Sequence, residues 1–187
     1  MDFARGKVLS KLNEAMKQFI RRSPLIIIST IDAKGCLDIS PKGDPAGFVE
    51  VDAGGNLLIP ERPGNKLTFG FRNILQNGEI GLIFMVPNQL ETLRVKGSAS
   101  LHDDPTVLEA MKVNDKPALL CTYVDVTECF FHCGKALVRS NLWQPEKWDQ
   151  GKRSIAARGL MSERNLEEEA VRQTEAALER SYTSDLY

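Results

Sequence analysis

A succession of short apolar segments joined by tight turns limits the folds that are open to this chain. The segment LIIISTI at 25–31 is continuous and β-branched, which is typical of a buried strand. The turn DAKG and the alternating segment CLDIS follow at once, so we expect a hairpin there. This pattern favours a small β-barrel with helical additions over a parallel α/β sheet. Further strands are predicted at 48–51, 57–60, 79–86, 91–101 and 118–131, the last of them bent or bulged.

Helices are predicted where apolar residues recur at a spacing of three and four. In the first of them Leu12, Met16 and Phe19 share one face, and Pro24 ends the helix. Asn65 is the expected N-cap of the second helix. The predicted helices span 6–21, 65–76 and 103–111, with a helical or turn-like segment at 132–143 and a charged, alanine-rich helix at 165–182.

The loops and breaks of the sequence suggest three parts. These are an N-terminal helix at 1–24, a barrel domain at 25–148, and a polar linker with a C-terminal helix at 149–187. Within the barrel domain, PKGDPAG at 41–47 is expected to be a loop. Its two prolines and two glycines disfavour regular structure.

The charge balance excludes several classes of partner. The 187 residues are 42% hydrophobic and 26% charged, with 24 Lys and Arg against 25 Asp and Glu. A net charge of -1 gives no overall field for nucleic acid or an anionic membrane, so any anion site must be built from a few residues. No apolar run approaches the roughly 18 residues of a membrane span, and the first residues lack the apolar block of a signal peptide. We expect a cytoplasmic protein that binds neither nucleic acid nor membrane.

The four cysteines are expected to be free thiols. Cys129, His132 and Cys133 lie together in CFFHC, and they raise the question of a zinc site. Structural zinc takes four ligands, usually in paired short spacings, and the only other histidine is His102. The sequence therefore predicts no metal site.

Two cations stand on the stiff turn PERPGNK at 60–66. The chain has no glycine-rich nucleotide motif, so charged side chains must hold any nucleotide phosphate. Arg62 and Lys66 flank Pro63 and Gly64 just before the second predicted helix. A guanidinium, an ammonium and a helix N-terminus together suit a dianionic phosphate. In the alternative interpretation the loop is solvated and Glu61 partly neutralises Arg62.

Further cations are candidates for contacts to a flat ring. Lys42 lies in SPKGD at a strand end, Arg94 lies on the alternating segment ETLRVKG, and HCGKALVRSNLW places Lys135 and Arg139 near Trp143. The alternatives remain open for these residues as well. Arg94 could form an ion pair on the outer face of the sheet, and Trp143 could simply pack in the core.

Taken together, the segments STIDAKGCLDISPKGDPAGF, LLIPERPGNKL, NILQNGEIGLIFMVP, ETLRVKGSASL and HCGKALVRSNLW resemble a known family. This family is the FMN-binding proteins related to pyridoxamine 5'-phosphate oxidase, and the resemblance covers about residues 25–148. It implies a mainly β fold with added helices, a six-stranded split β-barrel. It also implies a homodimer with two FMN sites at the subunit interface.

The resemblance also implies roles for individual residues. The flavin carries the redox step itself, with His132 a candidate proton donor that could equally be a core histidine. The phosphate is expected to contact Arg62, Asn65 and Lys66, and the length of the cofactor to contact Thr92 and Arg94. The ring is expected to lie near Ser40, Pro41 and Lys42. The other subunit is expected to contribute Lys135, Arg139, Ser140 and Trp143.

These residues predict an FMN-dependent oxidoreductase of a small molecule, with NAD(P)H a candidate electron donor. The segment DPAGFV lacks the Arg and Lys of the oxidases proper, which argues against a vitamin B6 substrate. FMN and a deazaflavin both remain open as the cofactor. A non-catalytic flavin- or haem-binding protein, with His132 as a haem ligand candidate, is the alternative function. A third reading is an interaction protein that uses its C-terminal helix.

Overall fold

The computed structural model describes residues 7–64, 67–148 and 168–184. The chain divides into two compact units, Met1–Pro145 and Glu146–Tyr187. The first unit holds the sheet and its helices. The second holds helix α6, Glu168–Ser184, which agrees with the charged helix expected near the C-terminus.

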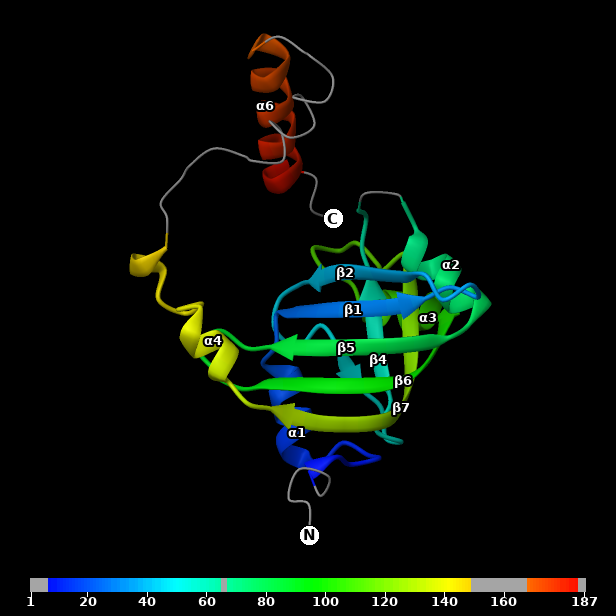
Figure 1. Cartoon of the computed structure of the whole chain (residues 1–187). Coiled ribbons are helices and arrows are strands. Elements are labelled where there is room, and N and C mark those ends of the chain that lie inside the picture. The colour runs from blue at the N-terminus through cyan, green and yellow to red at the C-terminus, as the bar shows by residue number, and fades with distance from the viewer. Residues whose placement is uncertain (1–6, 65–66, 149–167, 185–187) are drawn as a thin grey trace. The chain divides into compact units, whose positions relative to one another are not determined.

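The first unit is built on one antiparallel sheet of seven strands in the order β2-β1-β5-β6-β7-β4-β3. In Figure 1, β2, β1, β5, β6 and β7 lie side by side across the front, and β4 crosses behind them. The mainly β fold with added helices is confirmed, although the sheet has seven strands rather than the expected six. The strands are β1 Leu25–Ile31, β2 Leu37–Gly43, β3 Glu50–Val51, β4 Leu57–Glu61, β5 Glu79–Met85, β6 Thr92–His102 and β7 Leu120–His132.

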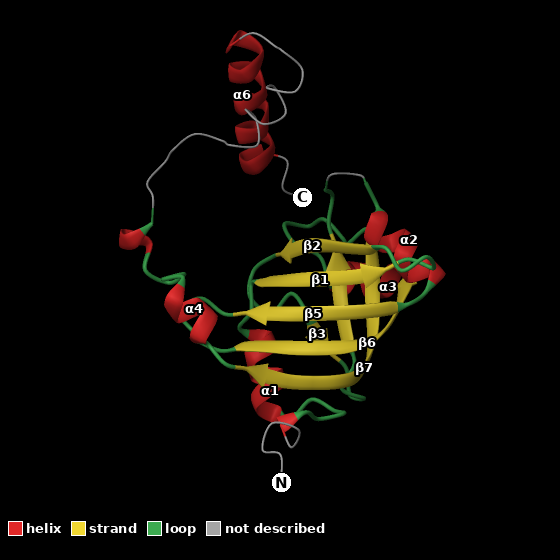
Figure 2. Cartoon of the chain, viewed as in Figure 1, coloured by secondary structure: helices red, strands yellow, loops and turns green. Residues whose placement is uncertain are grey.

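Short helices connect or flank the strands, as Figure 2 shows. The third predicted helix is confirmed with its acidic cap, because the Asp104 side chain accepts from the backbone N–H groups of Thr106 and Val107. The helices of this unit are α1 Glu14–Arg21, α2 Phe69–Gln76, α3 Pro105–Ala110 and α4 Lys135–Arg139, followed by the 3₁₀ turn η2 at Pro145–Lys147. In the part of the chain that the structure describes, no helix is long and apolar enough to cross a membrane.

A bulge bends the two longest strands. Lys96 of β6 lies opposite Glu128, but the next residue, Gly97, lies opposite Val126, so Thr127 is an extra residue in β7. Such an insertion increases the local twist and bends the strand. Beyond the bulge, residues 120–124 of β7 also pair with β4. The predicted bend is therefore confirmed, and it carries the sheet from its front strands to β4.

Strand β2 is longer than the sequence predicts. Instead of a loop from residue 41, the strand continues to Gly43, with Pro41 opposite Ile27 and Lys42 opposite Ile26. Proline cannot donate to a ladder, but β2 is the edge strand of the sheet and needs no donor on its outer side. Because directly opposed residues share a face, Lys42 lies on the inner face with the buried Ile26.

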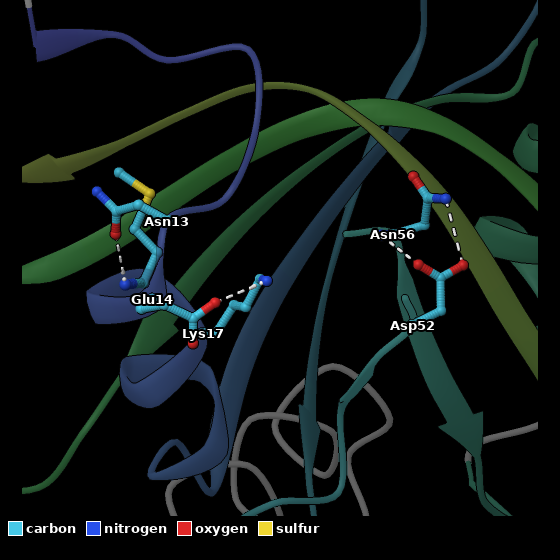
Figure 3. Close-up of polar contacts among 6 residues, drawn as sticks. Asn13, Glu14, Lys17, Asp52 and Asn56 are labelled. Atoms are coloured by element: carbon cyan, nitrogen blue, oxygen red, sulfur yellow. Dashed lines mark hydrogen bonds and ion pairs between the residues drawn. The ribbon is translucent and has the colours of Figure 1, made fainter. Parts of the chain in front are cut away.

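Helix α1 is shorter than predicted, beginning at Glu14 rather than at residue 6. The Asn13 side chain accepts from the Met16 backbone N–H at 2.9 Å and so caps the helix there, as Figure 3 shows. The preceding residues pair with the sheet instead: the Leu9 N–H donates to the Cys129 carbonyl at 2.9 Å, and the Cys129 N–H donates back at 2.8 Å.

The turn between β3 and β4 is fixed by side chains. The Asp52 carboxylate accepts from the Asn56 backbone N–H at 2.8 Å (Figure 3) and from the Tyr123 hydroxyl at 2.9 Å. These contacts hold the hairpin against β7.

The core lies between α1 and the inner face of the bent sheet. Phe19 of α1 meets Phe131 of β7 edge-to-face, with ring centroids 5.4 Å apart. Burying this much aliphatic and aromatic surface is the main source of stability for the fold. Fully buried members of the core are Ile20, Ile26, Leu57, Ile59, Phe84, Leu93 and Val124.

A substitution at Gly97 tests whether the bulge is present. A Cβ at this position would overlap the Asp125 carbonyl oxygen and lie 2.8 Å from Val124 Cγ1, both within well-ordered strands. We expect Gly97→Ala to lower the free energy of unfolding by about 3 kcal/mol, because neither neighbour can move without disturbing the ladder. Urea unfolding measures the loss.

The matched control is Gly81→Ala, since Gly81 lies in the neighbouring strand β5 and a Cβ there meets only ordinary contact at 4.0 Å. Its stability should stay within about 0.5 kcal/mol of the original. Equal effects at the two glycines would show that the tight bulge is not present in solution.

Candidate functional site

A cavity of about 570 Å³ opens between strands β1 and β2, the end of β4 and helix α2. This volume lies in the range of small-molecule sites. Its inner wall is polar, with Thr30, Asp38, Ser40, Lys42, Glu61 and Thr122. Apolar side chains that are about half exposed or more also line it, namely Ile39, Leu67, Phe69 and Leu119. The cavity therefore offers apolar contact and hydrogen-bonding groups together.

Glu61 is the most buried charged residue of this cavity, with 2% of its surface exposed. Lys42 Nζ donates to its Oε2 at 2.5 Å, and the Thr122 hydroxyl donates to its Oε1 at 2.8 Å. The Lys42 ammonium also lies 5.2 Å from the ring centroid of Phe71 in α2. Burying a carboxylate is costly unless it is paired and hydrogen-bonded, and Glu61 has both kinds of partner.

Arg62 is held within the chain and does not extend into solvent. Its Nε donates to Asp44 Oδ2 at 2.7 Å, and its Nη2 donates to the Met111 carbonyl at 2.6 Å. Only 12% of the Arg62 side chain and 1% of the Asp44 side chain are exposed. The alternative of a solvated loop is thus wrong for Arg62. The carboxylate that contacts it is Asp44, while Glu61 belongs to Lys42.

The two ion pairs join strands that do not neighbour each other in the sheet. Lys42 lies in β2 and Asp44 directly follows it, whereas Glu61 ends β4 and Arg62 directly follows that strand. They therefore connect an edge strand with a strand near the opposite edge. The connection forms one wall of the cavity.

The turn before α2 differs from its predicted form. The helix begins at Phe69, preceded by Thr68 in a left-handed conformation with φ of 54°, so the N-cap predicted at Asn65 is wrong. Asn65 and Lys66 lie outside the described residues. On either side of them, Gly64 and Leu67 both line the cavity.

Thr92 and Arg94 lie on the other face of the sheet from the cavity. Their neighbours Leu93 and Val95 are buried in the core, so the intervening residues face outward. The Arg94 guanidinium carbon is 5.3 Å from the ring centroid of Phe130, the residue opposite it in β7. Within one chain the structure does not bring these two residues together with Lys42.

The third predicted group surrounds α4. Lys135 and Arg139 line a second hollow of about 320 Å³ with Leu90, Glu91, Gly134 and Val138. The Ser140 hydroxyl donates to the Leu137 carbonyl at 3.1 Å, and Trp143 Nε1 donates to the Gln89 carbonyl at 2.7 Å. Trp143 is only partly buried and is not a member of the core, so this contact does not decide between packing and cofactor binding. His132 ends β7, exposed, opposite Thr92.

The cysteines are all free, and they divide into two kinds. Burial raises the pKa of the Cys121 and Cys129 thiols, so both stay protonated and pack as small apolar groups. Cys36 and Cys133 are exposed. Among the residues that the structure describes, no group of three or more His, Cys, Asp and Glu side chains could hold a metal ion.

The sequence analysis missed Asp44, Glu61 and Thr122. A pattern for two of them was present. Alternation from Leu57 and Ile59 places Glu61 on the buried face of β4, and alternation through Ser40 and Lys42 places Asp44 on the same side of β2. The pairing of the two strand ends depends on the bend of the sheet, which no local pattern contains.

Comparison with known proteins defines the family. A family model described as pyridoxamine 5'-phosphate oxidase matches residues 12–133, well over half of the chain. The chain belongs to the pyridoxamine 5'-phosphate oxidase family. The match confirms the resemblance stated above and extends it to α1. No curated protein matches the sequence.

Two solved structures support the fold. HupZ from Group A Streptococcus is 22% identical, with a TM-score of 0.51 over 64% of this chain and 93% of that one. A putative pyridoxamine 5'-phosphate oxidase from Lactobacillus delbrueckii is 21% identical, with a TM-score of 0.50 over 65% of this chain and 95% of that one. The sheet and helices described here are thus the fold of the family.

Arg62 is predicted to stabilise the fold. In Arg62→Ala the Asp44 carboxylate stays buried without its cation, so the free energy of unfolding should fall by about 3 kcal/mol. Arg72→Ala is the control, because Arg72 is exposed on α2, and its effect should stay below about 0.5 kcal/mol. Chemical denaturation measures both. An Arg62→Ala protein as stable as the control would show that Arg62 does not form its contacts with Asp44 and the Met111 carbonyl.

Proposed function

We propose that the chain is an FMN-dependent oxidoreductase whose flavin occupies the cavity beside β2 and α2. One observation carries the proposal. Ser40 and Lys42 from one sequence segment and Arg62 from another, all predicted as cofactor contacts, line a single cavity of about 570 Å³ in a member of the pyridoxamine 5'-phosphate oxidase family. Gly64 and Leu67, on either side of Asn65 and Lys66, line the same cavity.

The chemistry of the cavity fits a flavin. A tricyclic ring needs apolar contact for its faces, which Leu67 and Phe69 offer. The ring edge and the hydroxylated side chain of FMN need donors and acceptors, which Thr30, Ser40 and Thr122 supply from the inner wall. When bound, the flavin would supply the hydride and electron chemistry. The part of this chain is to bind the ring, exclude water and hold the Lys42 ammonium near the polar edge.

The phosphate contact is assigned to Lys66, with Asn65 beside it. Arg62 already has contacts to Asp44 and to the Met111 carbonyl, so its part is to fix the loop that carries Lys66. The substrate in this proposal is a small molecule and NAD(P)H is the candidate electron donor. Vitamin B6 is not proposed, because DPAGFV lacks the Arg and Lys of the oxidases proper.

A homodimer is part of the proposal. The outer face of the sheet exposes apolar side chains that no described element covers, namely Leu25, Leu37, Ile39 and Ile83, each at least 36% exposed. Apolar exposure of this kind marks a protein interface. In this proposal Thr92, Arg94 and His132, and the α4 residues Lys135, Arg139, Ser140 and Trp143, are the candidates for contacts made across the boundary between the two chains.

The absorption spectrum of the purified protein tests the cofactor. Flavin bands near about 370 and 450 nm, bleached by NADH or NADPH, are the expected result. A Soret band would favour the haem-binding alternative, for which the exposed His132 at the end of β7 is the candidate ligand. A colourless protein that takes up no flavin on reconstitution would contradict the proposal.

Lys66 gives a sharper prediction. Lys66→Ala should weaken FMN binding about tenfold or more but riboflavin binding less than about threefold, because only FMN carries the phosphate. Fluorescence titration measures both constants. Lys34→Ala, which removes an exposed lysine of the β1–β2 turn, is the control and should change neither. If FMN and riboflavin were weakened equally, the phosphate would have to bind elsewhere.

The outer face gives a prediction about assembly. Ile83 lies in β5 at the middle of this face, between Ile27 and Arg94. Ile83→Lys should convert the dimer to monomers, because burying an unpaired ammonium in an interface is costly. Sedimentation velocity measures the change. The control is Leu75→Lys, a 75% exposed residue of α2 outside the sheet; dissociation by both variants would point to general destabilisation.

A further inference from the structure

We propose that Glu61 sets the charge selectivity of the cavity. By neutralising Lys42, it weakens the binding of phosphate-bearing ligands and leaves uncharged ligands unaffected. This inference rests on the proposed flavin site, and it concerns a residue that takes no part in holding the flavin in that proposal.

The geometry fixes the carboxylate in place. One oxygen of Glu61 accepts from Lys42 at 2.5 Å and the other accepts from Thr122 at 2.8 Å, and 3% of the side chain is exposed. Both Glu61 and Thr122 line the cavity, so the charge faces any ligand there. Lys42 is the more accessible partner, with 27% of its side chain exposed.

Carboxylates outnumber cations at the described part of the cavity. Two cations, Lys42 and Arg62, line the cavity in the part of the chain that the structure describes. Each contacts a buried carboxylate, Glu61 for the first and Asp44 for the second. Asp38 adds a further carboxylate to the wall. An anion bound elsewhere in the cavity is therefore acted on by Glu61 as well as by Lys42, and the two fields oppose each other.

These opposing fields affect only charged ligands. In a partly buried site the repulsion between Glu61 and a phosphate is well above thermal energy, and it offsets most of the attraction to Lys42. Lys42 cannot leave Glu61 to serve the ligand alone, because a buried carboxylate without its partner is strongly unfavourable. It can only share its three donors between the two. For a neutral ligand such as riboflavin the charges cancel.

A competing role for Glu61 is to orient Lys42 toward the ligand. The two roles predict opposite signs for Glu61→Gln. Glutamine keeps the size of the side chain and an oxygen that can accept from Thr122 or Lys42, but it removes the negative charge. If charge selectivity is the role, FMN binds more tightly to the variant. If orientation is the role, FMN binds less tightly.

The experiment compares FMN and riboflavin on the full chain at fixed ionic strength, by fluorescence titration. We expect Glu61→Gln to tighten FMN binding about tenfold and to change riboflavin binding by less than about twofold. The matched control is Glu50→Gln, the same change at an exposed position of β3, which should change neither constant. In the double variant Lys42→Met/Glu61→Gln the gain should disappear, since the freed ammonium is its source.

Unchanged or weaker FMN binding by a folded Glu61→Gln protein would overturn the inference. If the unaltered chain bound no flavin at all, the proposed function would fail, and inorganic phosphate would then serve as the probe. Phosphate should still raise the melting temperature of Glu61→Gln more than that of the unaltered chain, with sodium chloride of equal ionic strength as the reference. Equal shifts with phosphate would overturn the inference independently of the flavin.

Discussion

Two ion pairs between strand ends hold together one wall of the cavity. Lys42 with Glu61 and Asp44 with Arg62 connect β2 to β4, which share no backbone hydrogen bonds in the sheet. The order of the charges is opposite on the two strands. If one strand end shifted along the other, Lys42 would face Arg62 or Asp44 would face Glu61, and the like charges would repel each other. The pairs therefore also fix how the two strand ends align. Since both carboxylates are almost fully buried, breaking either pair would leave an uncompensated charge.

The cations near the cavity do not all have the role that the sequence analysis expected. The cations near residues 60–66 look like a ready phosphate site, but Arg62 serves the fold and Lys42 is neutralised by Glu61. The cavity is therefore less basic than its composition suggests. Specific recognition of a phosphate in the proposed flavin site would fall largely to Lys66. Shape and hydrogen bonding would do the rest.

Much of the fold follows from local patterns. The β-branched run at 25–31 and its tight turn predict the first hairpin, and the acidic residue before Pro105 predicts a capped helix. What local patterns miss depends on position in the sheet. Pro41 is compatible with a strand only because β2 is an edge, and α1 starts late because the residues before Asn13 reach β7. The residues around α4 were predicted to come from the other subunit, so their distance from the cavity within one chain leaves that prediction untested. One chain does place Thr92 and Arg94 on the other face of the sheet from Lys42, because successive residues of a strand face opposite sides and Leu93 is in the core.

The prolines of β2 and β4 have an effect on how copies of this chain can meet. Pro41 lies in the edge strand, and Pro60 lies in the part of β4 that β3 does not cover. Pro41 has no N–H group to offer, so an incoming strand finds an interrupted ladder at the β2 edge, while the end of β4 that carries Pro60 is buried. Open sheets without such interruptions can polymerise edge to edge. In the proposed dimer, contact falls instead on the outer face of the sheet, where the pairing of two copies is closed and does not propagate.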